Sequence, residues 1–450
     1  MDPKYELPET NGVWSEKGRF ERLLGLEVAN CEALQLQGII SAEELRLIQQ
    51  EATIDWEVYG ERLRETRHDV SSFVFSVAQG IDRAAESRGL SIRPGRFIHL
   101  NLTSYDVWDT ALAMQIRESI DFIDDAIGLL LDAIKRRGVE HLHTLMIGRT
   151  HGMHAEPITF GHKLANYWFQ LQTQRRNLQE LRKFFEIAKI SGPVGSHANI
   201  PGEVEEYIAR KLGVQPIPIA TQIIPRDWIL RYLHHLDELG SVIEKIATDL
   251  RDMQRPEICE VEEPFPEGAE GSSIMVHKHN PEVWERCCSL SRIIAGQVVT
   301  ARMNVALWHE RDLSNSAAER IILLDSTTAA LYICRRLTET IAGMSIHPER
   351  MRANLTLTEG IVCSGQLLNL MVKKGMDRTA ARGMISSHTN RAWVEYKQGK
   401  PMPRLKAVFL GDAAIMEVVS QEELEDCFDP TYTNVLTGVD VSLRRLGWIE

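Results

Sequence analysis

The stretch LRYLHHLDELGSVIEKIATDLRDM, residues 230–253, decides the predicted fold of this chain. Its apolar side chains recur every three or four residues, the spacing that places them on one face of an α-helix. The apolar positions are Leu230, Leu233, Leu236, Leu239, Val242, Ile243, Ile246, Leu250 and Met253. A stripe sustained over the whole stretch predicts one long amphipathic helix.

Similar apolar stripes run through residues 107–134 and 158–187. Helices of this length bury their apolar faces only against one another, so the middle of the chain is predicted to form a bundle of long, roughly antiparallel helices. The polar faces carry alternating charges, which are typical of a solvated surface or of contact between subunits. Stripes exposed on so long a bundle favour self-association, and we expect an all-α oligomer.

Turn-forming residues divide the chain into three predicted helical domains. Breaks that contain glycine or proline fall at residues 93–95, 191–195, 216–218, 264–271 and 347–348. We expect a small N-terminal helical domain at 1–103, the central bundle of long helices at 104–350, and a second small helical domain at 351–450.

Composition and charge exclude several classes of protein. Of 450 residues, 44% are hydrophobic and 25% are charged, which is ordinary for a soluble globular chain. The net charge of −12 argues against a nucleic-acid binder, whose phosphate contacts need basic stripes. An anionic substrate would therefore require a local concentration of Arg and Lys.

The termini and cysteines indicate a cytoplasmic protein without a membrane partner. The opening residues, MDPKYELPET, show no secretory signal, and the longest apolar runs, such as 127–131, are far too short to cross a bilayer. The seven cysteines show no CxxC pairing, so we expect reduced, mostly buried thiols.

The loop GSSIMVHKHNP, residues 271–281, carries the clearest chemical pattern. Two adjacent serines follow a segment rich in Gly and Pro, and Lys278 and Asn280 stand at alternate positions before Pro281. Backbone N–H groups, a hydroxyl and a cation brought onto one small anion are what carboxylate chemistry requires. Taken alone, a Ser-Ser pair of this kind is better interpreted as part of a solvated Gly/Ser linker.

Four further segments are polar where a bundle would prefer apolar residues. They are ETRHDV (65–70), HLNLTSYD (99–106), GRTHGMHAEP (148–157) and LWHERDLSNSAAER (307–320). The hydroxyls of Thr103 and Ser104 precede a helical stripe, where they either cap free N–H groups or lie beside a bound anion. Arg311 and Arg320 with Ser316 suit a phosphate clamp, although paired Arg and Glu on an acidic surface are usually structural ion pairs.

Metal and cofactor signatures are missing from the sequence. The histidine pairs show neither HExxH spacing nor a nearby Cys pair, so we expect no metal. Neither GxGxxG nor GxxxxGK[ST] occurs, so a dinucleotide or P-loop site is not indicated.

At the polar segments the chain resembles the fumarase/aspartase superfamily and, within it, the adenylosuccinate lyase branch. The matching motifs are TRHDV (66–70), TS (103–104), GRTHGMHAEP, GSSIM with HKHN (271–280) and LWHERDLSNSAAERI (307–321), with SGPVGSHANI (191–200) and ATQ (220–222) between them. The resemblance covers nearly the whole chain. It implies a C–N lyase that eliminates fumarate from adenylosuccinate, giving AMP, and from succinyl-aminoimidazole-carboxamide ribotide in purine nucleotide biosynthesis.

The resemblance also implies catalytic roles. His151 would protonate the departing nitrogen, helped by Glu285, because a nearby carboxylate favours the charged imidazole that can donate a proton. Ser272 would remove the Cβ proton, which requires a closed loop that excludes water. Lys278, Asn280, Ser273 and loop N–H groups would stabilise the resulting aci-carboxylate. His68 would lie close to the reacting end of the substrate.

The remaining implied residues bind the substrate. Thr103, Ser104 and Gln222 would hold the succinyl carboxylates or the purine side. The residues implied to bind the nucleotide are Arg67, His68 and Asp69, and those implied to bind its phosphate are Lys4, Tyr5, Arg311, Ser316 and Arg320. Each site would be assembled from three subunits of a homotetramer. The chemistry needs no cofactor, because the carboxylates of the substrate supply the electron sink.

Four residues depart from the pattern of the branch. Val276 replaces a proline, Lys4 replaces an arginine and loses its bidentate fork, Arg286 replaces a substrate-binding asparagine, and Asn101 replaces a glycine. These departures leave open a second hypothesis, a C–N lyase acting on another N-substituted aspartate or succinate adduct. A third is a non-catalytic helical assembly protein. The joint presence of the catalytic residues argues against it, because an inactive scaffold has no physical need for all of them.

Overall fold

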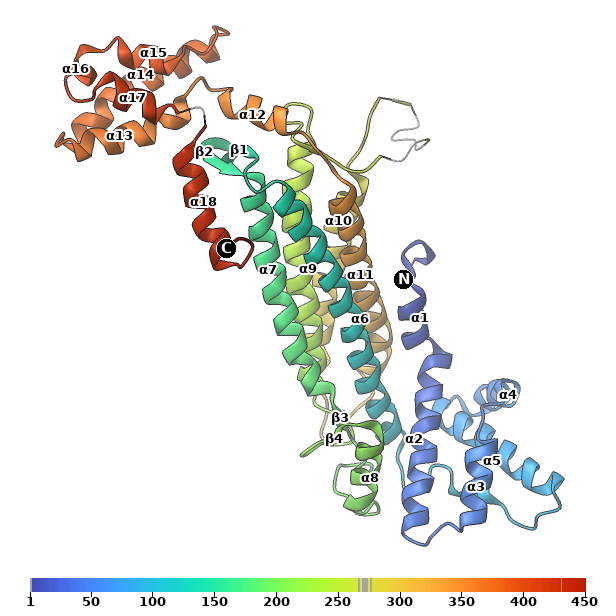
Figure 1. The fold of residues 1–450 in the computed structure, drawn as a ribbon. Coiled ribbons are helices and arrows are strands. Elements are labelled where there is room, and N and C mark those ends of the chain that lie inside the picture. The colour runs from blue at the N-terminus through green and yellow to red at the C-terminus, as the bar shows by residue number, and fades with distance from the viewer. Residues whose placement is uncertain (1, 266–267, 269–273, 276, 430) are drawn as a thin grey trace. The chain divides into compact units, whose positions relative to one another are not determined.

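The computed structural model describes residues 2–265, 268, 274–275, 277–429 and 431–450. Within these ranges the chain forms eighteen α-helices and three small two-stranded sheets (Figure 1). The five long helices are α6 (Ser104–Glu140), α7 (Phe160–Arg182), α9 (Arg226–Gln254), α10 (Glu282–Met303) and α11 (Ser316–Gly343). The predicted all-α fold built on long helices is confirmed.

The described chain divides into two compact units, each made of segments that are distant in sequence. Unit 1 comprises Met1–Gly128, Thr173–Glu244 and Arg286–Arg336, and unit 2 comprises Leu129–Gln172, Lys245–Glu285 and Leu337–Glu450. All five long helices continue from one unit into the other. The division into consecutive domains at 1–103, 104–350 and 351–450 stays a prediction.

The apolar stripe of residues 230–253 lies inside α9, as predicted. Leu233, Leu236 and Ile243 on this stripe are fully buried. Neighbouring helices contact α9 in both units: the Tyr232 hydroxyl is 2.8 Å from the Thr327 hydroxyl of α11, and the Tyr167 hydroxyl of α7 donates to Asp249 at 2.8 Å. The stripe therefore forms one side of a buried interface between helices.

The third predicted stripe, residues 158–187, is only partly helical. The segment before it forms a hairpin of β1 (Leu145–Thr150) and β2 (Met153–Thr159), and α7 begins at Phe160 and ends at Arg182. A 3-10 turn (Lys183–Phe185) and β3 (Ile187–Ala188) follow, and β3 pairs in parallel with β4 (Gln215–Pro216). The helix predicted after GRTHGMHAEP is confirmed, because α7 begins at Phe160, close to the expected start near 158. The hairpin that contains this motif was not predicted, and backbone pairing across the tight turn at residues 151–152 extends both of its arms.

The first helices of unit 1 pack around an aromatic core. They are α1 (Pro8–Trp14), α2 (Glu16–Leu36), α3 (Ala42–Glu51), α4 (Trp56–Thr66) and α5 (Asp69–Ser87), and α8 (Gly202–Leu212) packs on α2. Phe20 and Phe73 have ring centroids 5.2 Å apart at the centre of this core. The buried carboxylate of Glu27 accepts the backbone N–H of His99 and lies 2.7 Å from its Nδ1. Burial lowers the pKa of His99, but the hydrogen bond to Glu27 and the negative charges of Glu27 and Asp106 together raise the pKa overall.

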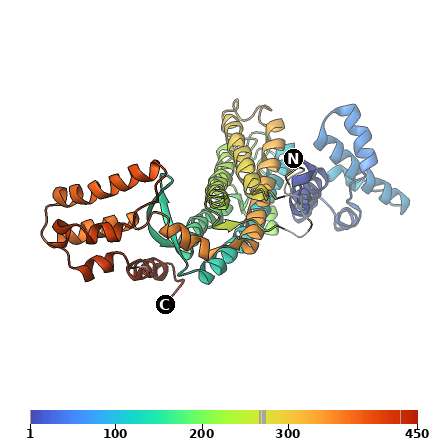
Figure 2. The same cartoon turned by 90° about the horizontal axis from the view of Figure 1, so that it is seen from above.

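The C-terminal helices of unit 2, orange to red in Figures 1 and 2, have a core of their own. They are α12 (Pro348–Thr356), α13 (Ser364–Lys373), α14 (Arg378–Lys397), α15 (Leu405–Leu410), α16 (Ala413–Met416), α17 (Gln421–Cys427) and α18 (Thr433–Arg445). Helices α13 to α17 supply this core, in which Leu367, Leu405 and Phe409 are fully buried. Helix α12 contacts β1, and α18 contacts β2. A short antiparallel sheet joins β5 (Val261–Glu262) to β6 (Ser345–Ile346) in the same unit.

Two findings bear on the expected environment of the chain. Six of the seven cysteines are buried, as predicted, and none of the seven takes part in a disulfide bond. Among the described residues no single helix is long and apolar enough to cross a membrane, and only the bent pair Pro348–Thr356 and Ile361–Lys373 passes that test, by length and composition alone.

A buried ion-pair network joins three long helices in unit 1. Arg226, at the start of α9, donates to both carboxylate oxygens of Asp109 on α6, at 2.7 and 2.9 Å. Its Nε lies 2.9 Å from Glu319 on α11. Asp109 also accepts the backbone N–H of Ile224 at 2.7 Å. The Arg226 and Asp109 side chains are almost completely buried, so each charge depends on its partners for stabilisation.

Replacing Asp109 with alanine is expected to lower the free energy of unfolding by about 3–5 kcal/mol, because it leaves Arg226 buried and unpaired. Asp121→Ala is the matched control, since Asp121 lies on the same helix and pairs with Arg182 at the surface. That pair should contribute about 1 kcal/mol or less. Urea denaturation measures the free energy of unfolding of both variants. An equal loss of this free energy in the two variants would contradict the importance assigned to the buried network.

Candidate active site

In unit 1 the structure brings Gln222, Arg311 and Ser316 together around Tyr105. The Arg311 guanidinium lies 3.6 Å from the Tyr105 ring centroid, and its Nη1 donates to the Gln222 side-chain oxygen at 2.9 Å. Burial raises the pKa of Tyr105, and a hydrogen bond to Ser316 opposes this shift. The Nε and Nη2 atoms of Arg311 are buried, and among the described residues neither has a hydrogen-bond partner. Arg311 therefore keeps donors available for an anion.

A second cationic cluster forms around Trp108 in the same unit. Arg320 donates to Asp69 at 2.7 Å, so the start of α5 is tied to α11. The guanidinium groups of Arg320 and Arg19 each lie 4.8 Å from the Trp108 ring. Burial first, and then repulsion from Arg320, lower the pKa of Arg19 to about 10. Positive charge is concentrated here on a chain whose net charge is −12.

The neighbouring predicted residues mark helix ends. Arg67 ends α4 in a left-handed conformation (φ 52°), and His68 caps α5, its Nδ1 accepting the Ser71 N–H at 3.1 Å. Both side chains are exposed. Ser104 begins α6, and the N–H of Thr103 donates to Asp106 at 2.8 Å. Helix termini and loops therefore position this part of the predicted binding set.

Within this chain, Lys4 and Tyr5 do not lie beside the other predicted phosphate-binding residues. The Tyr5 ring packs edge-on against Tyr332, with centroids 5.3 Å apart. Tyr332 follows Ser316 by sixteen residues on α11, which is about 24 Å along a helix axis. Arg286, one of the residues that depart from the branch, donates to the Tyr332 hydroxyl at 3.2 Å. The five predicted phosphate-binding residues are thus separated within this chain.

His151 lies at the tip of the β1–β2 hairpin in unit 2. Thr150 pairs with Met153, so His151 and Gly152 form a two-residue turn, with φ of 56° and 75°. Positive φ at both positions is the pattern of a type I′ turn. Gly148 is required at the irregularity in β1, because a Cβ there would lie 2.8 Å from the carbonyl oxygen of Glu156. The hairpin exposes the His151 side chain to solvent.

The ends of the serine loop are held by side chains from α9 and β5. Gln254 donates to the His279 carbonyl at 3.1 Å, and the His279 ring lies 2.7 Å from Glu262. Lys278 and Asn280 line a cavity of about 650 Å³ beside this stem. Ser272, Ser273 and Val276 lie outside the described residues.

Glu285 lies in the first turn of α10, where it accepts a hydrogen bond from Arg251 at 3.4 Å. The carboxylate of Glu263 caps the same helix by accepting the N–H groups of Val283 and Trp284, at 3.1 and 2.6 Å. Glu285 has no contact with His151 among the interactions described within this chain. The predicted acid and its carboxylate partner are therefore not paired among the interactions described in this chain.

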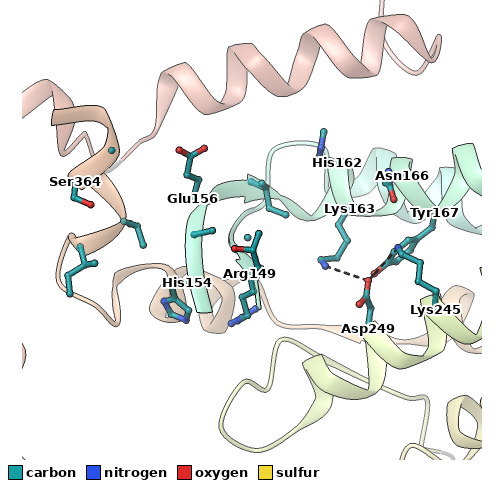
Figure 3. A pocket seen from close by; sticks show the side chains of 17 residues that line it. Arg149, His154, Glu156, His162, Lys163, Asn166, Tyr167, Lys245, Asp249 and Ser364 are labelled. Carbon is teal, nitrogen blue, oxygen red and sulfur yellow. Dashed lines mark hydrogen bonds and ion pairs between the residues drawn. The ribbon is translucent and has the colours of Figure 1, made fainter. Parts of the chain in front are cut away.

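A cavity of about 730 Å³ beside the hairpin contains polar residues that the sequence motifs did not single out (Figure 3). Asp249 accepts the Tyr167 hydroxyl and lies 3.9 Å from Lys163 and 3.6 Å from Lys245. Burial lowers the pKa of Lys163, and Asp249 opposes this shift. The polar positions 162, 163 and 166 share one face of α7, a spacing that could have predicted this wall of the cavity. Among the described residues no His, Cys, Asp or Glu cluster is suited to a metal ion.

Comparison with known proteins now defines the family. Residues 4–299 match the family described as Lyase, and residues 360–435 match the family described as the adenylosuccinate lyase C-terminus. The chain is 39% identical to the adenylosuccinate lyase of Aquifex aeolicus, covering 96% of this chain and 95% of the relative. It is 36% identical to that of Bacillus subtilis, covering 99% and 100%. The chain belongs to the adenylosuccinate lyase family.

Solved structures agree on the fold. The fumarate lyase of Mesorhizobium sp. BNC1 superimposes with a TM-score of 0.85 at 21% identity, covering 98% of both chains. The 3-carboxy-cis,cis-muconate lactonizing enzyme of Pseudomonas putida gives 0.84 at 24% identity, covering 98% of this chain and 97% of that one. The family predicted from the motifs is confirmed, whereas the roles of individual site residues stay predictions.

Substitution of Gly152 with alanine is expected to destabilise the hairpin tip. No heavy atom lies within 4 Å of the added Cβ, so the cost arises from its φ of 75° alone and should be about 1–2 kcal/mol. Lyase activity should also fall, because His151 shares the turn. Gly60→Ala is the control: its Cβ also meets open space, but Gly60 is helical, and the change should stabilise the protein by about 1 kcal/mol. Thermal unfolding and activity assays measure both variants. Equal changes in stability and activity for Gly152→Ala and Gly60→Ala would show that the turn assignment is mistaken.

Proposed function

We propose that this chain eliminates fumarate from adenylosuccinate, leaving AMP, and from succinyl-aminoimidazole-carboxamide ribotide in purine nucleotide biosynthesis. The observation that carries the proposal is its likeness, over nearly its whole length, to two enzymes named adenylosuccinate lyase. The printed sequence also retains His151, Glu285, Ser272, Lys278 and Asn280.

The Arg311 cluster supports a phosphate-bearing substrate. Two buried N–H-bearing atoms of Arg311 have no partner among the described residues, and Gln222 and the Tyr105 ring hold its guanidinium in place. A fixed guanidinium with free donors suits the oxygens of a phosphate, which accept bidentate hydrogen bonds. Ser316 and Arg320 would complete this set from α11. Lys4 and Tyr5 would reach it from another subunit.

The succinyl end would be held by shorter polar groups. Thr103, Ser104 and Gln222 would bind the carboxylates or the purine side, and Arg67, His68 and Asp69 would bind the nucleotide. Asp69 is already oriented by Arg320. His68 would lie near the reacting end. Its Nδ1 accepts the Ser71 N–H, so Nε2 would be the ring nitrogen that meets the substrate.

The elimination would begin with removal of the Cβ proton by Ser272. Electrons from the broken C–H bond form the Cα=Cβ double bond, through an aci-carboxylate on the neighbouring carboxyl group. Lys278, Asn280 and Ser273 would stabilise this second negative charge, which develops only along the reaction. The described part of the loop supports this role, because its stem is held on both sides and Lys278 and Asn280 line one cavity.

Cleavage of the C–N bond would be completed by His151. The imidazolium donates its proton to the departing nitrogen, and fumarate is released. A carboxylate beside the ring favours the protonated form, which is the role assigned to Glu285. Since Glu285 contacts Arg251 in its own chain, the carboxylate that meets His151 would belong to another subunit.

We further propose a cytoplasmic homotetramer in which three subunits contribute to each site. Three features support shared sites: His151 is exposed at a hairpin tip, Tyr5 packs about 24 Å along α11 from Ser316, and Glu285 lacks a contact with His151 in its own chain. The long helices also expose the apolar side chains of Leu129, Phe169, Val299, Met303 and Ile321. Burial of such a surface between subunits would stabilise the assembly.

A second candidate keeps the chemistry and changes the substrate to another N-substituted aspartate or succinate adduct. The position of Arg286 favours it, because this residue departs from the branch and lies against Tyr332 together with Tyr5. A non-catalytic assembly protein is the third reading and is the least supported. Rapid turnover of adenylosuccinate would exclude the second candidate, and any turnover would exclude the third.

Purified protein is expected to convert adenylosuccinate to AMP, measured by ultraviolet absorbance with fumarate identified as the product. His151→Ala and Ser272→Ala should each lower kcat about 100-fold or more, because each removes a proton-transfer group. His234→Ala and Ser241→Ala, both exposed on α9, should leave activity unchanged. Failure of the unaltered protein to release fumarate from either purine substrate would refute the proposal.

Mixing the two inactive variants tests whether sites are shared. If His151 and Ser272 of one site come from different subunits, then tetramers reassembled from His151→Ala and Ser272→Ala chains contain some intact sites. Activity should therefore return on mixing, although neither variant is active alone. Reassembled tetramers that remain inactive, with subunit exchange verified by mass spectrometry, would show that one subunit supplies both groups.

A further inference from the structure

Glu260 is a buried carboxylate that contacts two segments of unit 2. Its side chain is fully inaccessible to solvent and accepts two hydrogen bonds from Arg149, at 3.0 and 2.9 Å. Asn354 donates a third hydrogen bond to the Glu260 carboxylate, at 2.9 Å. The same Asn354 amide also donates to the Ile258 carbonyl, at 2.8 Å. All these contacts are charge-assisted or buried, which makes the geometry specific.

The segment on one side of this carboxylate is the hairpin that carries His151. Arg149 lies in β1, two residues before His151, and pairs with His154 across the hairpin. Its planar guanidinium fork allows little rotation when both N–H groups are bonded to one carboxylate. The Arg149–Glu260 pair therefore fixes the direction of β1 just before the turn.

The segment on the other side is the stem of the serine loop. Glu260 directly precedes β5, and its carbonyl accepts the N–H of His347 at 3.0 Å, next to the β5–β6 pairing. The following residues, Glu262 and Glu263, hold His279 and the start of α10. The position of Glu260 thus determines where the described loop stem begins.

We propose that Glu260 is a positioning residue that holds the His151 hairpin and the loop stem in one fixed relation. The expected effect on turnover rests on the proposed function. The structural connection that Glu260 makes between the hairpin and the loop stem does not depend on that function. Glu260 touches neither substrate nor reacting atoms and acts through Arg149 and β5. A misplacement of catalytic groups by about 1 Å can lower a rate by about 100-fold, so loss of this connection should affect turnover more than binding. With sites shared between subunits, the two segments need not serve the same site.

The test compares Glu260→Gln with Asp124→Asn in the full-length assembly. Asp124 is a matched control, because it also accepts two hydrogen bonds from an arginine, Arg175, and one from an amide, Gln179, but these bonds join α6 to α7 and include neither of the two segments. Glu260→Gln should lower kcat by about 10- to 100-fold with little change in KM. Glu260→Asp should restore part of the lost kcat, since it keeps the charge. Asp124→Asn should leave kcat unchanged.

Hydrogen exchange supplies a readout that does not need activity. In Glu260→Gln, amides of residues 145–159 and of residues 260–263 and 277–284 should exchange faster together, whereas Asp124→Asn should leave both groups unchanged. Faster exchange in only one segment, or a kcat no lower than that of Asp124→Asn, would overturn the inference. If the unaltered protein releases no fumarate, the proposed function fails and the exchange experiment still decides the role of Glu260.

Discussion

The buried pair between Arg226 and Asp109 is the interaction on which the rest of unit 1 depends. Asp109 lies on α6 just after Ser104, and it also holds the backbone at Ile224, two residues past Gln222. Glu319, which pairs with Arg226, lies between Ser316 and Arg320 on α11. Because buried charges are stabilised only with good geometry, this network fixes the relative positions of three segments that carry predicted binding residues.

The local placement of arginine side chains explains how an acidic chain can bind an anion. Arg311 rests on Tyr105, and Arg19 and Arg320 lie against Trp108. Aromatic faces attract cations without neutralising them, so the guanidinium groups are held in place while donors stay available. In unit 2 the opposite arrangement holds: Arg149 donates to both carboxylate oxygens of Glu260, and its proposed role is to orient a hairpin.

Much of the molecule was predictable from local sequence. The stripe in 230–253 predicted α9, because helical periodicity persists wherever one face is buried, and the motif order identified the family. The hairpin at 145–159 was missed, since the positive φ at His151 and the bulge at Gly148 depend on backbone pairing between strands. The cavity around Asp249 was also missed, because its lysines come from two helices distant in sequence.

The sequence alone determined the all-α fold, the family and the kinds of side chain available for elimination, because periodicity and motif spacing are local properties. Only the tertiary structure decided which of those side chains meet. It joined Arg311 to Gln222 and Arg320 to Asp69, yet it left Tyr5 distant from Ser316 and Glu285 beside Arg251. The physical reason is that a long helix carries its residues 1.5 Å apart along a rigid axis, so residues at opposite ends of one helix cannot converge within a single chain.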